Sequence, residues 1–142
     1  MKKIAIFFIT VVAIVSLMFF TYSNYKANIR QAQKENLKFD IYVEKEIQGL
    51  ELATLINKAI DSNEKNEVKK DNKGKYIDNE KNTINIDIKF MDDDELYNIE
   101  KIYNSGIEKF LTYYRFLMFK NTEVKYHSSG KIKYMKFEQI SE

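Results

Sequence analysis

The N-terminal 25 residues contain the feature that most restricts the fold, a long apolar segment without charge. After Lys2 and Lys3, no charged residue occurs from Ile4 to Tyr25. The hydrocarbon core of a bilayer is about 30 Å thick and needs roughly 20 apolar residues in helical form, because it holds no water to satisfy the backbone. The apolar region of a secretory signal is shorter, about 7–15 residues. We therefore predict that residues 1–25 form an uncleaved transmembrane anchor.

The charges next to this segment predict its orientation. Lys2 and Lys3 precede it, so the positive-inside rule places the N-terminus in the cytoplasm and residues 26–142 outside. Lys26 and Arg30 follow the segment and oppose this assignment. A second interpretation stays open, a signal peptide cleaved after Ser23, although the small-residue pattern of such a site is incomplete there.

The composition of residues 26–142 predicts one small extracytoplasmic domain. Two of the 23 basic residues precede the span, which leaves 21 against 21 acidic residues, so no long-range field attracts nucleic acid. The chain has no cysteine, which excludes disulfides and thiolate chemistry. Heavy use of Lys, Asn and Ile is typical of AT-rich bacterial genomes. An exported domain without cysteine fits the surface of a Gram-positive cell.

Periodicity predicts the elements of the first half of this domain. Residues 26–37 contain no helix breaker and extend the membrane helix outward, with Ile29, Ala32, Asn36 and Phe39 on one side. Residues 39–47 fit either a helix or a strand. Gly49 marks a turn, and residues 50–62 form an amphipathic helix. The polar residues 61–82 form a surface excursion, with a possible short strand at residues 75–77.

The second half predicts helices packed on an antiparallel sheet, which gives an α+β fold. Apolar and polar residues alternate strictly along residues 83–90, which predicts a half-buried antiparallel strand. Asp92 and Glu95 form a capping box for a helix over residues 93–104, and Ser105 with Glu108 repeats it for a helix over residues 106–117. Residues 123–127 and 131–137 form a hairpin around residues 128–130.

Two groups of residues are candidates for protein interaction. Thr10, Ala13 and Ser16 lie on one side of the membrane helix, where small side chains allow a neighbouring helix to approach. Aromatic residues gather near the end of the last predicted helix and offer either a binding surface or core volume. They are Tyr113, Tyr114, Phe116 and Phe119.

No pattern predicts a catalytic, cofactor or metal site. The consecutive acids of residues 92–95 lack the spacing of a calcium loop and suit a helix start, and Asp71 and Asp78 are interrupted by lysines. His127, the only histidine, is predicted to be a plain polar residue at the hairpin tip. The lysines of the hairpin are interpreted as protection of an edge strand, with contact to anionic polymer or lipid as the alternative.

The layout resembles that of type IV pilins and pseudopilins, in which a membrane helix continues outward and carries a small α+β domain. The segment Glu46–Ile60, EIQGLELATLINKAI, is similar to segments of small pilin-like proteins of Gram-positive secretion and pilus clusters. The chain departs from that family in lacking the prepilin peptidase site and the glutamate that follows it. The resemblance implies a structural or assembly role.

The sequence therefore predicts a non-enzymatic, single-pass protein of the bacterial cell membrane. Our first hypothesis is a pilin-like structural or assembly component of a secretion or pilus machine, with protein partners or self-association in the envelope. The alternative is a monomeric membrane-anchored binding or sensing module, which would use either the aromatic face or the lysine-rich hairpin.

Overall fold

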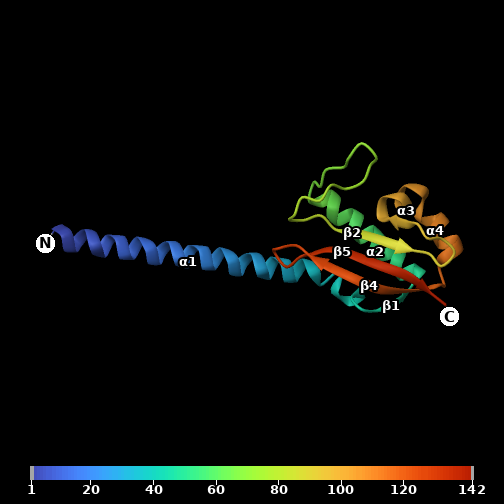
Figure 1. The fold of residues 1–142 in the computed structure, drawn as a ribbon, viewed down its shortest axis with the longest axis horizontal. Coiled ribbons are helices and arrows are strands. Elements are labelled where there is room, and N and C mark those ends of the chain that lie inside the picture. The colour runs from blue at the N-terminus through green and yellow to red at the C-terminus, as the bar shows by residue number, and fades with distance from the viewer. Residues whose placement is uncertain (1, 142) are drawn as a thin grey trace.

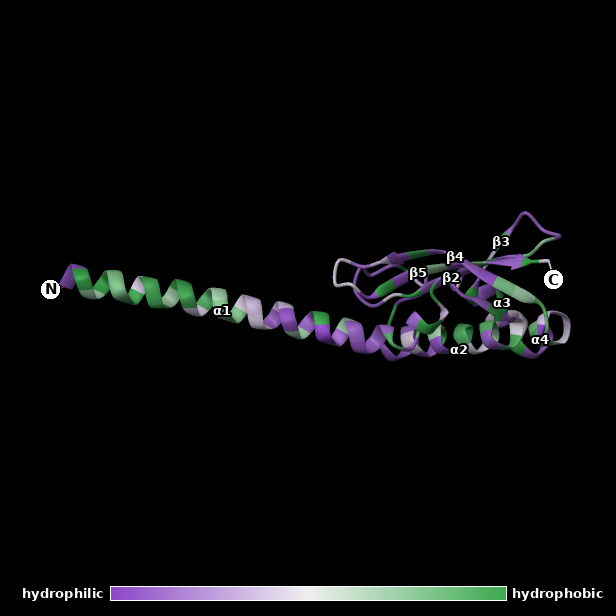
Figure 2. Cartoon of the chain, turned by 90° about the horizontal axis from the view of Figure 1, so that it is seen from below, coloured by the Kyte–Doolittle hydropathy of each residue, from purple (hydrophilic) through white to green (hydrophobic). Residues whose placement is uncertain are grey.

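The computed structural model describes residues 2–141, and its most prominent element is a long N-terminal helix. Helix α1 runs from Lys2 to Asn36 and projects from a small α+β domain (Figure 1). Its N-terminal part is coloured as apolar over several turns and becomes polar toward the domain (Figure 2). The helix is long and apolar enough to cross a membrane, and no residue of its apolar stretch is buried against the domain.

The last turns of α1 are fastened to the domain at one hairpin tip. The predicted stripe is confirmed, since Ala32 and Phe39 are buried. Asn36 binds the backbone on either side of Lys131: its Nδ2 donates to the Gly130 carbonyl at 2.8 Å and its Oδ1 accepts from the Ile132 N–H at 2.9 Å. An amide side chain, which can both donate and accept, thus takes the place of a neighbouring strand at this point.

Residues 39–47, which fit helix or strand by sequence, contain both types of structure. A single 3-10 turn, η1 (Asp40–Tyr42), leads to the short edge strand β1 (Glu46–Gln48). Helix α2 (Gly49–Lys65) follows, and its predicted apolar stripe is fully buried. Gly49, which was predicted to mark a turn, is instead the first residue of α2. A Cβ there would lie 1.9 Å from the Tyr114 carbonyl oxygen, so only glycine permits this contact.

The sheet is mixed, which corrects the prediction of an antiparallel one. Its strand order is β1-β4-β5-β2-β3, with β2 (Asn85–Lys89) parallel to β5 (Ile132–Ile140) and every other pair antiparallel. Alternation along residues 83–90 correctly predicted which side chains of β2 are buried. It could not predict the direction of the neighbour, because alternation reports the two faces of a strand and not its partners.

The acidic residues after β2 do not begin a helix. The chain first forms strand β3 (Leu96–Asn98), and helix α3 (Ile99–Ser105) starts with Asn98, whose side chain accepts from the Lys101 N–H at 2.8 Å. Gly106, at φ 96°, separates α3 from helix α4 (Ile107–Tyr114), as the predicted kink required. The second capping box is also wrong, because the Ser105 hydroxyl donates to the carbonyl of Lys101.

The last predicted helix ends early, at Tyr114, and residues 115–117 form a turn that leads into strand β4 (Met118–Tyr126). Strand β1 pairs only with residues 118–120 of β4, and among residues 2–141 no strand pairs with the outer edge of residues 122–126.

Helices α2, α3 and α4 cover one face of the sheet and bury the core (Figures 1 and 2). The other face carries ion pairs such as Lys120–Glu46 and Lys136–Glu138.

Buried polar side chains fix the long connection between α2 and β2. Asn63 donates to the Ile84 carbonyl and accepts from the Ile84 N–H, both at 2.8 Å. His127 is also buried, with Nε2 at 2.7 Å from the Thr83 carbonyl, so it joins two segments and is not the plain loop residue that we predicted. Residues 75–77 form an isolated bridge between Lys70 and Tyr76 in place of a strand.

Candidate functional site

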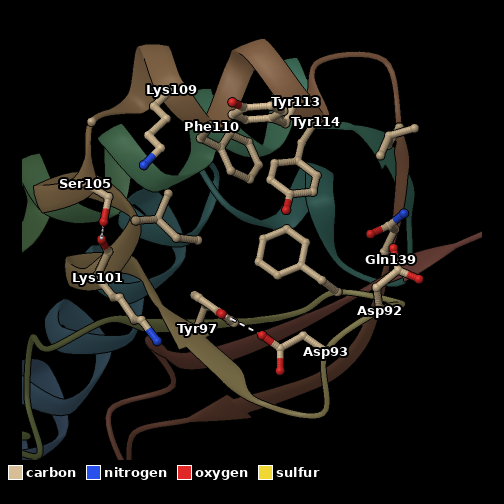
Figure 3. Close-up of a pocket in the computed structure, with 14 residues that line it drawn as sticks. Asp92, Asp93, Tyr97, Lys101, Ser105, Lys109, Phe110, Tyr113, Tyr114 and Gln139 are labelled. Atoms are coloured by element: carbon tan, nitrogen blue, oxygen red, sulfur yellow. Dashed lines mark hydrogen bonds between the residues drawn. The ribbon is translucent and has the colours of Figure 1, made fainter.

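A pocket lined largely by aromatic side chains lies at the end of the domain opposite to α1. Strand β5 begins beside the end of α1 and runs away from it, and the pocket forms where β2, α3 and α4 end near the last residues of β5 (Figures 1 and 3). The nine residues of β5 carry the chain about 30 Å at 3.3 Å per residue. The pocket therefore faces away from the apolar end of α1, and we call this end of the domain the distal end.

Aromatic rings form the floor and walls of the pocket. The ring of Phe90 packs against Tyr114 with centroids 4.4 Å apart and against Tyr97 at 5.2 Å. Phe110 lies 5.2 Å from Tyr114, while Tyr113 is exposed at the mouth. Within residues 2–141 the hydroxyl of Tyr114 has no hydrogen-bond partner, so it is free to bond to a ligand. The cavity has a volume of about 530 Å³.

Polar side chains at the rim are held in place by their neighbours. The Tyr97 hydroxyl donates to Asp93 at 2.6 Å, and this hydrogen bond raises the pKa of Tyr97 to about 12. The same bond, with the Glu95 N–H, lowers the pKa of Asp93. Lys101 lies 3.9 Å from the centroid of Tyr97 and 3.0 Å from Glu95. The rim thus combines both charges around an aromatic floor.

The structure separates the predicted aromatic cluster into three environments. Tyr113 and Tyr114 line the pocket, and Phe116 is 70% exposed beside it. Phe119 is completely buried under Phe90 and Phe110, so it is a core residue and does not reach a partner in this fold. Its strand position explains the difference, because β4 begins at Met118 and turns Phe119 inward.

Thr10, Ala13 and Ser16 lie far from this pocket, on the exposed part of α1. The Thr10 hydroxyl donates to the Ile6 carbonyl at 2.9 Å and the Ser16 hydroxyl to the Val12 carbonyl at 2.8 Å. Both hydroxyl protons are therefore used within the helix, and close packing is what these positions offer to a neighbouring helix.

The remaining acidic candidates serve local structure. Asp71 accepts from the N–H groups of Lys73 and Lys75, and Asp78 forms an ion pair with Lys133. Among residues 2–141, no three His, Cys, Asp or Glu side chains converge as metal ligands would. The hydroxyl of Ser105, the serine nearest the pocket, donates to its own helix, so it does not form a pair with a general base.

Sequence reasoning missed most of the pocket because its residues come from distant segments. Phe90 and Phe110 each stood in a predicted buried stripe, and nothing in the spacing predicted that the two stripes meet. Tyr97, Lys101 and Gln139 complete the lining from β3, α3 and β5. The placement of Tyr97 depends on β3, whose residues lie within the helix predicted over residues 93–104.

An aromatic floor with a few polar groups at the rim suits the binding of an apolar or aromatic group with a polar edge. Comparisons of the chain with protein-family models, with curated proteins and with solved structures find no match. The geometry of the site is therefore the basis for the functional argument.

Proposed function

We propose that this chain is a non-enzymatic docking protein of the bacterial cell envelope. In this proposal α1 crosses the cytoplasmic membrane with its N-terminus inside, and the domain stands outside. The distal pocket binds a side chain of another envelope protein. The observation that carries the proposal is an aromatic pocket at the distal end, with exposed Tyr113 at its mouth and exposed Phe116 next to Tyr113. Leu50, whose N–H donates to the Arg115 carbonyl, is exposed close to Phe116.

A protein partner suits this surface better than a lipid of the same membrane. The eleven residues of α1 after Tyr25 extend about 16 Å, and the pocket lies a further strand length from the end of α1. In the proposed orientation these two lengths hold the pocket away from the surface of the membrane. Exposed tyrosine and phenylalanine side chains are also enriched in protein interfaces. The pilin-like form of the proposal makes the partner a subunit of a secretion or pilus machine.

Photo-crosslinking in intact cells tests the proposal. A photoreactive amino acid at Tyr113 should give a discrete adduct, whereas the same probe at exposed Lys73, on the far loop, should not. With the photoreactive amino acid placed at Leu50 instead, the double variant Tyr113→Ala, Phe116→Ala should no longer form the adduct. Equal adducts from Tyr113 and Lys73 would refute docking at the distal end.

The alternative, a monomeric binding or sensing module, is favoured by the concave shape of the pocket, which also suits a small ligand. Leucine at Thr10, Ala13 and Ser16 separates the two proposals, because it preserves the hydrophobic length while it blocks close helix packing. An assembly subunit should lose its crosslinked neighbours in this triple variant. A monomeric module should behave as before.

A further inference from the structure

We propose that α1 carries a binding site for one anionic phospholipid at the point where it leaves the membrane. The site consists of Tyr22, Ser23, Lys26, Ala27 and Arg30. This inference rests on α1 crossing a bilayer, and it is independent of what the distal pocket binds.

The two cations of this site, and Lys34 one turn beyond them, lie on the side of α1 that is turned away from the domain. Lys26, Arg30 and Lys34 are spaced by four and share one side of the helix. At 100° per residue they lie roughly 130° around the axis from the side that contains Ala32 and Asn36. All three are exposed, and within residues 2–141 none of them has an acidic partner. Their charges are thus available to an external anion.

A hollow on the helix surface adjoins the first two cations. Its lining is Phe19, Tyr22, Ser23, Lys26, Ala27 and Arg30. The small side chains Ser23 and Ala27, one turn apart, leave the space, and the longer side chains surround it. Phe19 extends the lining toward the apolar part of α1, as an acyl chain would require. The hollow therefore has a charged end and an apolar end.

The hydroxyl of Ser23 differs from the other hydroxyls of the apolar helix. Those of Thr10, Ser16 and Thr21 donate to carbonyls of the preceding turn. Within the described residues Ser23 makes no such bond, so its proton is free for a phosphate oxygen. With the Arg30 guanidinium, which can bind phosphate in bidentate fashion, the hollow offers a neutral donor and a charged one.

The height of the site matches the headgroup layer. The helix from Ile4 to Tyr25 spans about 33 Å, close to the hydrocarbon thickness. Lys26 then lies at the headgroups and Arg30 about 6 Å further out, with Tyr22 and Tyr25 as interfacial aromatics. Lys34 lies about 12 Å beyond Lys26, above the phosphates. The first two cations should therefore contact lipid, and the third should not.

The test uses the full chain in nanodiscs with a minority of phosphatidylglycerol in phosphatidylcholine. Native mass spectrometry of the released protein measures which lipid remains bound. The unmodified chain should retain phosphatidylglycerol well above its share of the bilayer. Lys26→Gln with Arg30→Gln should reduce this enrichment by about fivefold per charge removed, whereas Lys34→Gln should leave it unchanged.

A second variant separates a formed site from diffuse attraction. Ser23→Leu with Ala27→Leu fills the hollow but keeps both cations, and it should remove the enrichment while the domain melts as before. Undiminished enrichment in this variant, or in Lys26→Gln with Arg30→Gln, would overturn the proposal. So would retention of a soluble poly(glycerol phosphate) in preference to phosphatidylglycerol, which would identify a wall polymer as the occupant.

Discussion

At the scale of single residues, a few polar side chains replace backbone partners that the sheet does not supply. Asn63 is completely buried, and both hydrogen-bonding groups of the Ile84 backbone depend on it. Asn36 performs the same task for Gly130 and Ile132. An unpaired buried backbone group costs about 1–3 kcal/mol, so the loss of the buried Asn63 side chain should lower the stability more than the loss of the partly exposed Asn36.

The Asn63 contact can be tested directly. Asn63→Leu should lower the free energy of unfolding by roughly 2–5 kcal/mol, because it leaves the N–H and the carbonyl of Ile84 unpaired in the core. Asn57→Leu, on the exposed side of the same helix, should change it by less than about 0.5 kcal/mol. Urea denaturation of the full chain in detergent micelles measures both. Similar losses in the two variants would contradict the assigned role of Asn63.

Gly49 gives a second prediction at this scale. Gly49→Ala places a methyl group against the Tyr114 carbonyl and should cost about 1–3 kcal/mol, as overpacking does. Gly74→Ala meets no neighbouring atom, and its positive φ alone should cost roughly 1 kcal/mol. The thermal midpoints of the two variants, followed by circular dichroism, should therefore differ. A Gly49→Ala variant as stable as the unmodified chain would refute the close contact.

At the scale of elements, the β5 side of the hairpin tip is fixed by charge as well as by hydrogen bonds. Lys131 contacts Glu35 of α1 at 2.7 Å and Asn82 at 2.8 Å. Lys133 pairs with Asp78 of the long connection. Burial raises the pKa of Asp78, but the hydrogen bond from Lys133 and the Glu80 N–H outweigh it, so the net shift is downward.

This lowered pKa predicts how the hairpin responds to acid. A carboxylate whose pKa is lower in the folded state contributes stability that is complete above its ordinary value of 3.8 and is lost as the pH falls through the folded value. The chain should therefore lose stability below about pH 4. The Asp78→Asn variant should be less stable than the unmodified chain at neutral pH, and it should lose less of its stability between neutral pH and pH 3. Urea denaturation of both proteins across this pH range measures the free energy of unfolding, and parallel pH dependence of that energy in the two proteins would contradict the prediction.

The joint between α1 and the hairpin predicts a local effect on exchange. Asn36→Ala should increase amide hydrogen exchange at Ile132, whose N–H then lacks its acceptor, while the central strand β2 keeps its protection. Asn28→Ala, on an exposed position of the same helix, is the matched control. Unchanged exchange at Ile132 would show that the joint does not depend on Asn36.

Elements with a clear period could be predicted from the sequence, and elements stabilised by distant contacts could not. The stripe of α2 and the alternation of β2 each report a buried face, and both were confirmed. Strand β3 has only three residues and exists because β2 offers an edge, a fact absent from its own sequence. Its misassignment as helix removed Tyr97 from the predicted site. Phe119 takes the core alternative that the sequence left open, because β4 turns it inward, and the aromatic pattern alone could not decide between core and surface.

At the scale of the whole molecule, the fold places an apolar helix and an aromatic pocket at opposite ends. Accessible-lysine labelling of intact protoplasts tests the proposed orientation. The lysines of the domain should be modified, while Lys2 and Lys3 should react only after lysis. Modification of the domain only after lysis would reverse the proposed topology.

The outer edge of β4 at residues 122–126, which has no strand partner among residues 2–141, restricts how two copies in one membrane could pair. Two identical edges related by a twofold axis join as antiparallel strands, and β4 runs nearly along the direction of α1 (Figure 1). Such a pair would turn the two helices in opposite directions, toward two different bilayers. Under the proposed anchoring of every copy in the same membrane, this geometry would prevent an antiparallel edge-to-edge dimer of β4. The exposed backbone of residues 122–126 is left to strands that carry no anchor of their own.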